Sequence, residues 1–140
     1  MIEVANNHPC IRFPRGDTHR TIYSVLETES ASLAALSVVF VGDGNIREIN
    51  KRFLRHDDVT DVIAFSLEGG LGVDGEVYVN LDRAKKQAKE YGVSFREETR
   101  RLLVHGTLHL LGYDDATGRA RARMREREDY HLAKLSSKKR

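Results

Sequence analysis

The feature that most constrains this fold is a leucine-rich helix that carries two histidines. The pattern Ser94-x-x-Glu97 is typical of a capping box, which opens a helix, and Gly112 is placed to end it. Apolar side chains surround this helix almost completely, at Leu102, Leu103, Val104, Leu108, Leu110 and Leu111. A helix that is apolar on every side must be covered on every side. We therefore expect a central, buried helix with the rest of the chain packed around it.

The two histidines of this helix, His105 and His109, are spaced for a metal site. Residues four apart lie on one helical face, so both imidazoles can be directed at a common point. Gly112 can adopt a left-handed conformation that turns the chain back and presents Asp115 as a third ligand. Two neutral imidazoles and one carboxylate suit Zn²⁺, and three protein ligands leave a fourth position for water, as in catalytic sites. Ni²⁺ and Co²⁺ accept the same ligand types.

Each of these residues also has a simpler interpretation. A lone histidine in an apolar helix is usually a hydrogen-bonded core residue. Two of them would need two separate buried hydrogen-bond arrangements, whereas one divalent ion satisfies both. Asp114 or Asp115 can be an ordinary turn residue. The histidine pair favours a metal site over these alternatives.

We expect residues 1–140 to form a single α+β domain, with a small mixed sheet of about four strands packed with helices. Alternating or β-branched patterns predict strands over Ile2–Val4, Leu36–Val41, Val62–Ser66 and Glu76–Leu81. The last two lie on either side of Gly69-Gly70 and are expected to pair antiparallel.

Further helices are predicted from apolar spacing and from capping residues. One runs over about Asp17–Ser30 with Asp17 or Thr18 as its cap, and one runs from Asn45 through Phe53. A third is capped by Asp82, carries Ala84, Ala88 and Tyr91 on one side, and ends at Gly92. A last, basic helix is expected over about 117–135, followed by a basic tail to residue 140.

Composition narrows the function classes. No apolar run is long enough to span a bilayer and the start, Met1-Ile-Glu-Val, lacks the pattern of a secretory signal, so a cytoplasmic protein is expected. The chain has a single cysteine, Cys10, which can form neither an internal disulfide nor a metal site of paired thiolates. The formal net charge is only +2, but residues 119–140 contain nine basic and three acidic side chains. This segment is either a contact for RNA or phosphate or a solvated helix with a basic tail.

Gly106 limits what a metal bound here can do. The spacing His-x3-His-x2-Gly-x2-Asp is similar to that of metzincin peptidases, in which a glutamate follows the first histidine and acts as general base. Glycine cannot accept a proton. The metal must therefore act as a Lewis acid, through its own hydroxide, or with a carboxylate supplied from elsewhere in the chain.

Three segments resemble the YbeY family of bacterial rRNA maturation endoribonucleases. His105 to Asp115 matches the family motif HGxLHLxGYDH except at the last ligand, where Asp115 replaces histidine. Thr60 to Phe65, read TDVIAF, resembles the family segment TDVLSF, and Gly75 to Asp82 resembles a GDIVIS-like strand followed by a helix start. The order of segments fits the family from about Val38 to Leu132, roughly two thirds of the chain.

The resemblance implies a zinc-dependent endoribonuclease that is directed at single strands, matures the ends of ribosomal RNA and helps to remove defective ribosomes. The expected partner is ribosomal RNA in the small ribosomal subunit. An arginine that the family associates with activity falls at about Leu54 here, and Arg55 follows one place later. Asp115 in place of histidine adds a negative charge, which should make the metal less electrophilic.

The residues and the resemblance together give a hypothesis for the site. His105, His109 and Asp115 would hold one Zn²⁺ ion, and Arg55 and His56 would stabilise the negative charge that develops on the phosphate. Arg55 and Thr60 are also expected to contact the substrate. Asp61 is either a proton acceptor or a turn or cap residue.

Two other functions use the same ligands. One is a non-catalytic ribosome-associated factor, in which a fourth protein ligand would close a structural metal site and the basic C-terminal segment would bind rRNA. The other is a metal-dependent hydrolase of a peptide or small molecule. Gly106 disfavours the hydrolase, and a narrow apolar pocket beside the metal would favour it.

Overall fold

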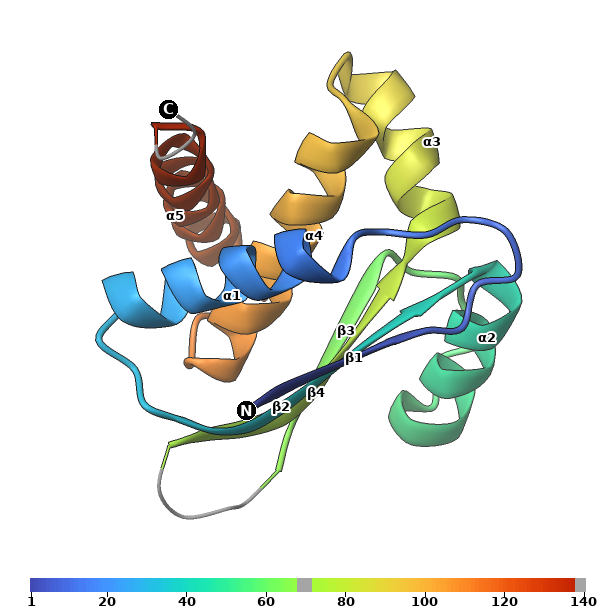
Figure 1. The fold of residues 1–140 in the computed structure, drawn as a ribbon. Helices are drawn as coiled ribbons and strands as arrows, with labels where there is room; N and C mark the ends of the chain where they lie inside the picture. Colours follow the sequence, from blue (N-terminus) through green and yellow to red (C-terminus); the bar gives the residue numbers. More distant parts are fainter. Residues whose placement is uncertain (68–71, 138–140) are drawn as a thin grey trace.

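The computed structural model describes residues 1–67 and 72–137 and has an α+β architecture built on one mixed sheet (Figure 1). The strands are β1 (Ile2–Asn6), β2 (Leu33–Val41), β3 (Val62–Ser66) and β4 (Val73–Asn80). The helices are α1 (Arg15–Thr28), α2 (Asp43–Ile49), α3 (Leu81–Tyr91), α4 (Phe95–Leu110) and α5 (Gly118–Ser137), and a π-helical segment, η1 (Asn50–Leu54), continues α2. The predicted fold class is confirmed.

The sheet has the strand order β1-β2-β4-β3. The strands β1, β2 and β4 run parallel, and β3 pairs antiparallel with β4 at the edge, with Val62 opposite Val79. The predicted antiparallel pairing is therefore confirmed, while the turn residues Gly69-Gly70 lie outside the described residues. Val38, Phe40 and Val41 of β2 are buried and Val39 is half-buried, which explains the apolar run at the end of this strand.

Helix α4 lies at the centre of the molecule, as predicted. It packs on β3 and β4 and also contacts α1, α3 and α5. Leu102, Leu103, Val104 and Leu108 are buried in this packing. Gly106 allows the close approach to the sheet, because a Cβ atom at this position would lie 2.7 Å from Val77 Cγ1. The helix that carries the two histidines is thus fixed on several sides.

The opposite face of the sheet is covered in part by α2, as Figure 1 shows. Val41 and Ile63 project from the sheet to this side and form a small core cluster with Ile46 of α2. The predicted helical stripe does not continue to Phe53, which lies in η1 with 62% of its side chain exposed. The widening of the helix at η1 rotates Phe53 away from the direction that a regular α-helix would give it.

Several predicted helix starts are wrong by a few residues because tertiary contacts choose the cap. Helix α2 begins after Gly42, not at Asn45. Helix α3 is capped by Asn80, whose side chain accepts hydrogen bonds from the backbone N–H groups of Asp82 and Arg83. The predicted cap Asp82 instead accepts a hydrogen bond from His8, 2.8 Å away.

Helix α1 begins at Arg15, so Asp17 lies inside its first turn rather than at its cap. Asp17 is buried and accepts hydrogen bonds from Arg96 and Arg100 of α4, which ties α1 to the central helix. Ser94 caps α4 through a hydrogen bond from the Glu97 N–H, as predicted. Gly92 also ends α3 as predicted, with a left-handed φ of 68°. Tyr91 does not share the burial of Ala84 and Ala88 and is exposed.

Candidate active site

Three side chains that the sequence predicts as metal ligands converge at the C-terminal end of α4. His105 and His109 lie one helical turn apart, with ring centroids 4.7 Å from each other. Gly112 has a φ of 100°, and the chain turns back there so that Asp115 faces both rings. The Asp115 carboxylate lies 3.4 Å from His105 Nε2 and 3.5 Å from His109 Nε2. This left-handed conformation is open to glycine at little cost.

The geometry of this triad fits a divalent metal ion. One ligand atom from each of the three residues lies within 4.8 Å of the others, and the described part of the chain contains no second such group. Two imidazole nitrogens and a carboxylate oxygen form a donor set typical of Zn²⁺ and related ions. The triad can therefore bind a metal, and the ligand types alone do not select one.

Glu128 of α5 orients one of the ligands. Its carboxylate accepts a hydrogen bond from His105 Nδ1 at 2.6 Å, which leaves Nε2 of the ring to face the triad. The Glu128 side chain is only 7% exposed and also accepts a hydrogen bond from Arg101 at 2.9 Å. A carboxylate that holds the far nitrogen of a ligating histidine fixes its orientation and raises its basicity.

Sequence reasoning missed Glu128 because it counted this residue among the charges of a basic helix. A signal was present in the helical spacing. Met124, Glu128, His131 and Leu135 are the buried residues of α5, and they recur every three or four residues. A glutamate on the buried stripe of an otherwise charged helix needs a partner inside the protein.

The negative charges around His105 affect its protonation in the metal-free protein. Burial acts to lower its pKa, but the hydrogen bond to Glu128 and the charges of Glu128, Asp115 and Asp61 outweigh burial. The pKa of His105 is therefore raised above its ordinary value. A metal must displace this proton when it binds, so metal affinity should fall at acidic pH.

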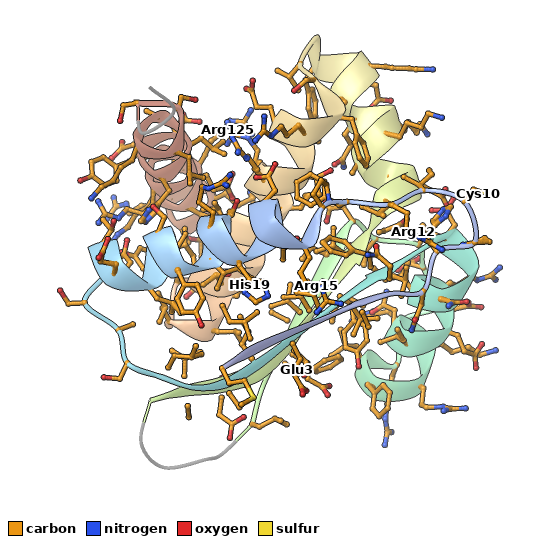
Figure 2. All side chains as sticks on the ribbon, in the orientation of Figure 1. Glu3, Cys10, Arg12, Arg15, His19 and Arg125 are labelled. Atoms are coloured by element: carbon orange, nitrogen blue, oxygen red, sulfur yellow. The ribbon has the colours of Figure 1, made fainter. Side chains whose placement is uncertain are left out.

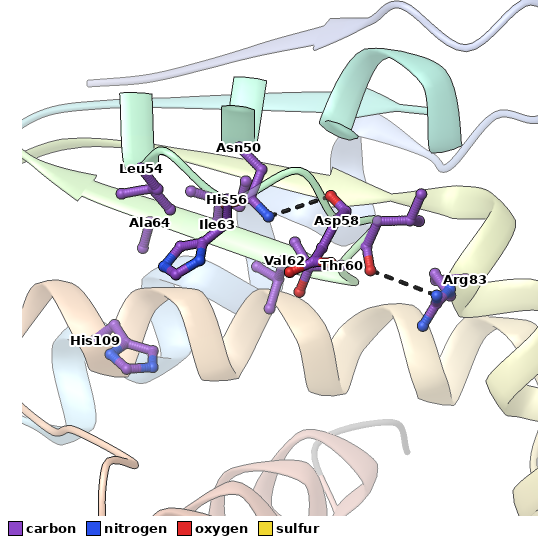
Figure 3. Close-up of a pocket in the computed structure, with 11 residues that line it drawn as sticks. Asn50, Leu54, His56, Asp58, Thr60, Val62, Ile63, Ala64, Arg83 and His109 are labelled. Carbon is purple, nitrogen blue, oxygen red and sulfur yellow. Dashed lines mark hydrogen bonds between the residues drawn. The ribbon is translucent and has the colours of Figure 1, made fainter. Parts of the chain in front are cut away.

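The triad lies between two hollows. The first, here called the His109 hollow, has a volume of about 710 Å³ and is lined by residues of η1, the loop before β3, and β3, together with Arg83 and His109. Figure 3 shows His109 at one end of it, Arg83 at the other and His56 between them. The second, here called the His105 hollow, has a volume of about 410 Å³ and lies among α3, α4 and α5, with His105 and Asp115 on its wall.

The family described as Endoribonuclease YbeY matches residues 4–136. The chain belongs to the YbeY endoribonuclease family. The resemblance found in the sequence motifs is thereby confirmed, and it extends beyond the segment from Val38 to Leu132.

Individual relatives of this YbeY-family chain agree with that assignment. A protein of Salinibacter ruber named Endoribonuclease YbeY is 40% identical over 94% of this chain and 89% of its own length. One of Chlorobaculum tepidum with the same name is 43% identical over 79% of this chain and 81% of its own length. The solution structure of the protein TM1509 from Thermotoga maritima has a similar fold, with a TM-score of 0.65, 22% identity, and coverage of 99% of this chain and 94% of that one.

The structure brings some of the other predicted site residues to this YbeY-family site. His56 and Thr60 line the His109 hollow, and the Thr60 carbonyl accepts a hydrogen bond from Asn80. Asp61 lines the His105 hollow and accepts a hydrogen bond from Gln87 at 3.2 Å. The two neighbours Thr60 and Asp61 thus contribute to different sides of the triad.

Arg55 is placed differently. It is exposed, has a left-handed φ of 59° at the end of η1, and does not line either hollow. Leu54, where the resemblance led us to expect the family arginine, lines the His109 hollow instead. Arg83 of α3 also lines this hollow and donates a hydrogen bond to the Val59 carbonyl. Sequence reasoning missed Arg83 because nothing in its local pattern distinguishes it from a surface arginine.

The lining of both hollows bears on the alternative of a peptide or small-molecule hydrolase. A narrow apolar pocket beside the triad would favour such an enzyme. The two hollows have a mixed lining, in which histidine, aspartate and arginine side chains stand beside apolar ones. In the described residues, no helix combines the length and the hydropathy needed to cross a bilayer.

Proposed function

We propose that this YbeY-family endoribonuclease uses one Zn²⁺ ion, held by His105, His109 and Asp115, to cleave single-stranded RNA. We further propose that its substrate is ribosomal RNA in the small ribosomal subunit, that it serves rRNA maturation and the removal of defective ribosomes, and that it acts in the cytoplasm. RNA cleavage is the activity of the family to which the chain belongs. The observation that supports the metal-dependent part is the convergence of the three ligand atoms between two hollows that carry charged side chains.

A divalent ion bound here would supply Lewis-acid polarisation of a phosphate oxygen. The chain's own groups supply the rest of the site. His56 and Arg83 line the His109 hollow and can donate hydrogen bonds to phosphate oxygens of a strand lying in it. Asp61, on the other side, is placed among the residues of the His105 hollow as a proton acceptor. Arg55, being exposed at the end of η1, is proposed to contact the RNA outside the hollow.

Arginines of α5 support RNA as the partner. Arg121 and Arg125 line the His105 hollow, whereas Arg119 and Arg123 lie on another side of the helix and line a separate hollow with Tyr113. Guanidinium groups beside a strand neutralise its phosphates and release condensed counterions. A strand that crosses the triad from one hollow to the other would pass Arg121 and Arg125.

The rival function is a non-catalytic ribosomal RNA-binding factor with a structural metal. A structural ion would be closed by a fourth protein ligand. In the residues that the structure describes, the ligand group has three members. Three ligands favour a catalytic ion.

The decisive experiment combines elemental analysis with cleavage of a structured rRNA fragment. We expect about one metal ion per chain, loss of cleavage after chelation with the fold retained, and recovery when Zn²⁺ is restored. His109→Ala should lose both metal and cleavage, while His19→Ala, a histidine variant on α1 outside both hollows, should keep them. Unfolding on chelation would support the structural ion, and a His109→Ala protein with full metal content and full cleavage would refute the proposal.

A further inference from the structure

The His105 hollow contains a buried acidic side chain whose role is not yet explained. Glu98 of α4 lines this hollow with only 3% of the residue exposed. None of the hydrogen bonds or ion pairs found in the described residues involves its carboxyl group. Arg101, the nearest guanidinium on its own helix face, is engaged by Glu128 and Asp129 instead. A buried carboxyl without a partner costs free energy unless something else supplies donors.

A fully buried acceptor without a partner lies in the same hollow. The side-chain carbonyl Oε1 of Gln87 is buried and has no hydrogen-bond partner, while its Nε2 donates to Asp61. Gln87 and Glu98 project from α3 and α4, the two helices that form this side of the hollow. The hollow therefore presents one buried acceptor without a donor, Gln87 Oε1, beside the carboxyl group of Glu98.

A second cation is not the natural occupant of this interior. Among the described residues, the only acidic and histidine side chains whose ligand atoms come together as a group are those of the triad. Burial also raises the pKa of Glu98 to about 7, because the surroundings disfavour its charged form. A group in this state is better suited to hydrogen bonding with a neutral polar ligand than to holding an ion.

The rim of the His105 hollow carries an aromatic ring and two guanidinium groups. Tyr91 at the end of α3 is 58% exposed and offers an aromatic ring for stacking. Arg121 and Arg125 are exposed on α5 and offer guanidinium groups for phosphate, and Figure 2 labels Arg125 where α5 faces α4. Single-stranded RNA is recognised by this combination of stacking, phosphate contacts and hydrogen bonds to base edges.

We propose that the His105 hollow is a nucleobase subsite that takes an amino-bearing base of the nucleotide next to the cleaved phosphate, and that it rejects uracil. This inference rests on the proposed function, because it places the base beside the triad. The carboxyl oxygens of Glu98 and the carbonyl oxygen of Gln87 would accept hydrogen bonds from the base. Guanine fits best, since its N1–H and N2–H groups lie side by side and can meet both oxygens of one carboxylate. Uracil has a single ring N–H between two carbonyl oxygens, which would face these acceptors unfavourably.

The test measures binding of single nucleotides to the metal-loaded, ¹⁵N-labelled protein by NMR titration, so that no cleavage is needed. We expect GMP to bind about tenfold more tightly than UMP, because a site built to hydrogen-bond its ligand discriminates strongly against one that leaves its groups unpaired. IMP lacks only the amino group of guanine and should lose much of that gain. The side-chain amide signal of Gln87 should shift on addition of GMP.

A substitution assigns the preference to Glu98. Glu98→Gln keeps the size of the side chain but replaces one acceptor by a donor, so the ratio of GMP to UMP affinity should fall to within about threefold. Glu97→Gln, at the exposed neighbouring position, is the matched control and should keep the wild-type ratio. The spectrum of each variant reports whether it is folded, and the comparison of GMP with IMP on the wild type does not depend on any variant.

The outcomes separate this subsite from the proposed function. Equal affinities of the wild-type protein for GMP, IMP and UMP would overturn the subsite, as would a wild-type ratio retained by folded Glu98→Gln. Discrimination among nucleotides by a chain that cleaves no RNA would support the subsite and refute the proposed function. Cleavage of oligonucleotides at equal rates whichever base occupies each position would leave the endoribonuclease intact and overturn the subsite.

Discussion

Glu128→Gln should weaken metal binding without contacting the metal. The substitution keeps the shape of the side chain and removes the negative charge that faces His105 Nδ1 at 2.6 Å. Glutamine can still accept one hydrogen bond through its carbonyl oxygen, but it cannot serve both His105 and Arg101 as the carboxylate does. The ring of His105 would lose part of its orientation and of its basicity.

The magnitude follows from what outer partners of metal ligands contribute. Removing such a partner usually costs about 10–100-fold in metal affinity, or about 1.4–2.7 kcal/mol. Because the glutamine retains one acceptor, we expect about tenfold for Glu128→Gln. Glu128→Ala removes both hydrogen bonds and leaves the partly buried Arg101 with Asp129 alone, so we expect a loss toward 100-fold together with lower stability.

The assay is competition for Zn²⁺ between the protein and a coloured chelator, with Glu126→Gln on the exposed side of α5 as the control. An NMR pH titration of the metal-free proteins adds a second readout. The pKa of His105 is raised mainly by Glu128, so it should fall in Glu128→Gln and stay unchanged in the control. Zinc affinity within twofold of the wild type, with an unchanged His105 pKa, would refute the positioning role of Glu128.

Three further predictions concern the central helix and the turn that follows it. Gly106→Ala would place a methyl group 2.7 Å from Val77 Cγ1. This overpacking costs about 1–3 kcal/mol and should outweigh the helix-propensity gain of about 1 kcal/mol. Urea denaturation should show a lower stability of the variant, and adding Val77→Ala to the same chain should restore part of it. Asp115→His should keep about one metal ion per chain by elemental analysis, whereas Asp115→Ala should lose more affinity than an outer partner does. The pKa of Glu98 in the folded protein, about 7, exceeds its ordinary value of 4.5. Between these pH values the folded protein therefore binds more protons than the unfolded chain. Its free energy of unfolding should fall as the pH rises through this range, by up to about 3 kcal/mol. Denaturation of metal-free protein at pH 5 and pH 8 should show this fall in the wild type and a smaller one in Glu98→Gln; equal falls would contradict the assignment.

The sequence predicted the fold class and the ligand triad because both depend on local patterns. The apolar surroundings of His105 and His109 define a buried helix, and their spacing with Gly112 and Asp115 defines which side chains can converge. Strand β3 was predicted with its observed bounds, Val62–Ser66, since its β-branched run is closed by a turn signal. These features are set by periodicities of two and 3.6 residues, which can be read along the chain.

Contacts between segments that are distant in the sequence decided the cap of α3 and the partner of His105. Asn80 rather than Asp82 caps α3, because its buried side chain also bonds to Asp43 and to the Thr60 carbonyl. Glu128 meets His105 only because α5 packs on α4, and no spacing in the sequence brings residues 23 apart together.

The sequence alone thus determined which residues can hold a metal, since one helical turn and one glycine are enough to aim three side chains at a point. Only the tertiary structure decided what surrounds that point. It placed Arg83 and His56 on one side and Glu98 and Gln87 on the other, and it left Arg55 outside. The physical reason is that a ligand set on one helix and its following turn is fixed by local backbone geometry. The walls of the hollows come from seven segments, from η1 to α5, whose relative positions depend on how the whole core packs.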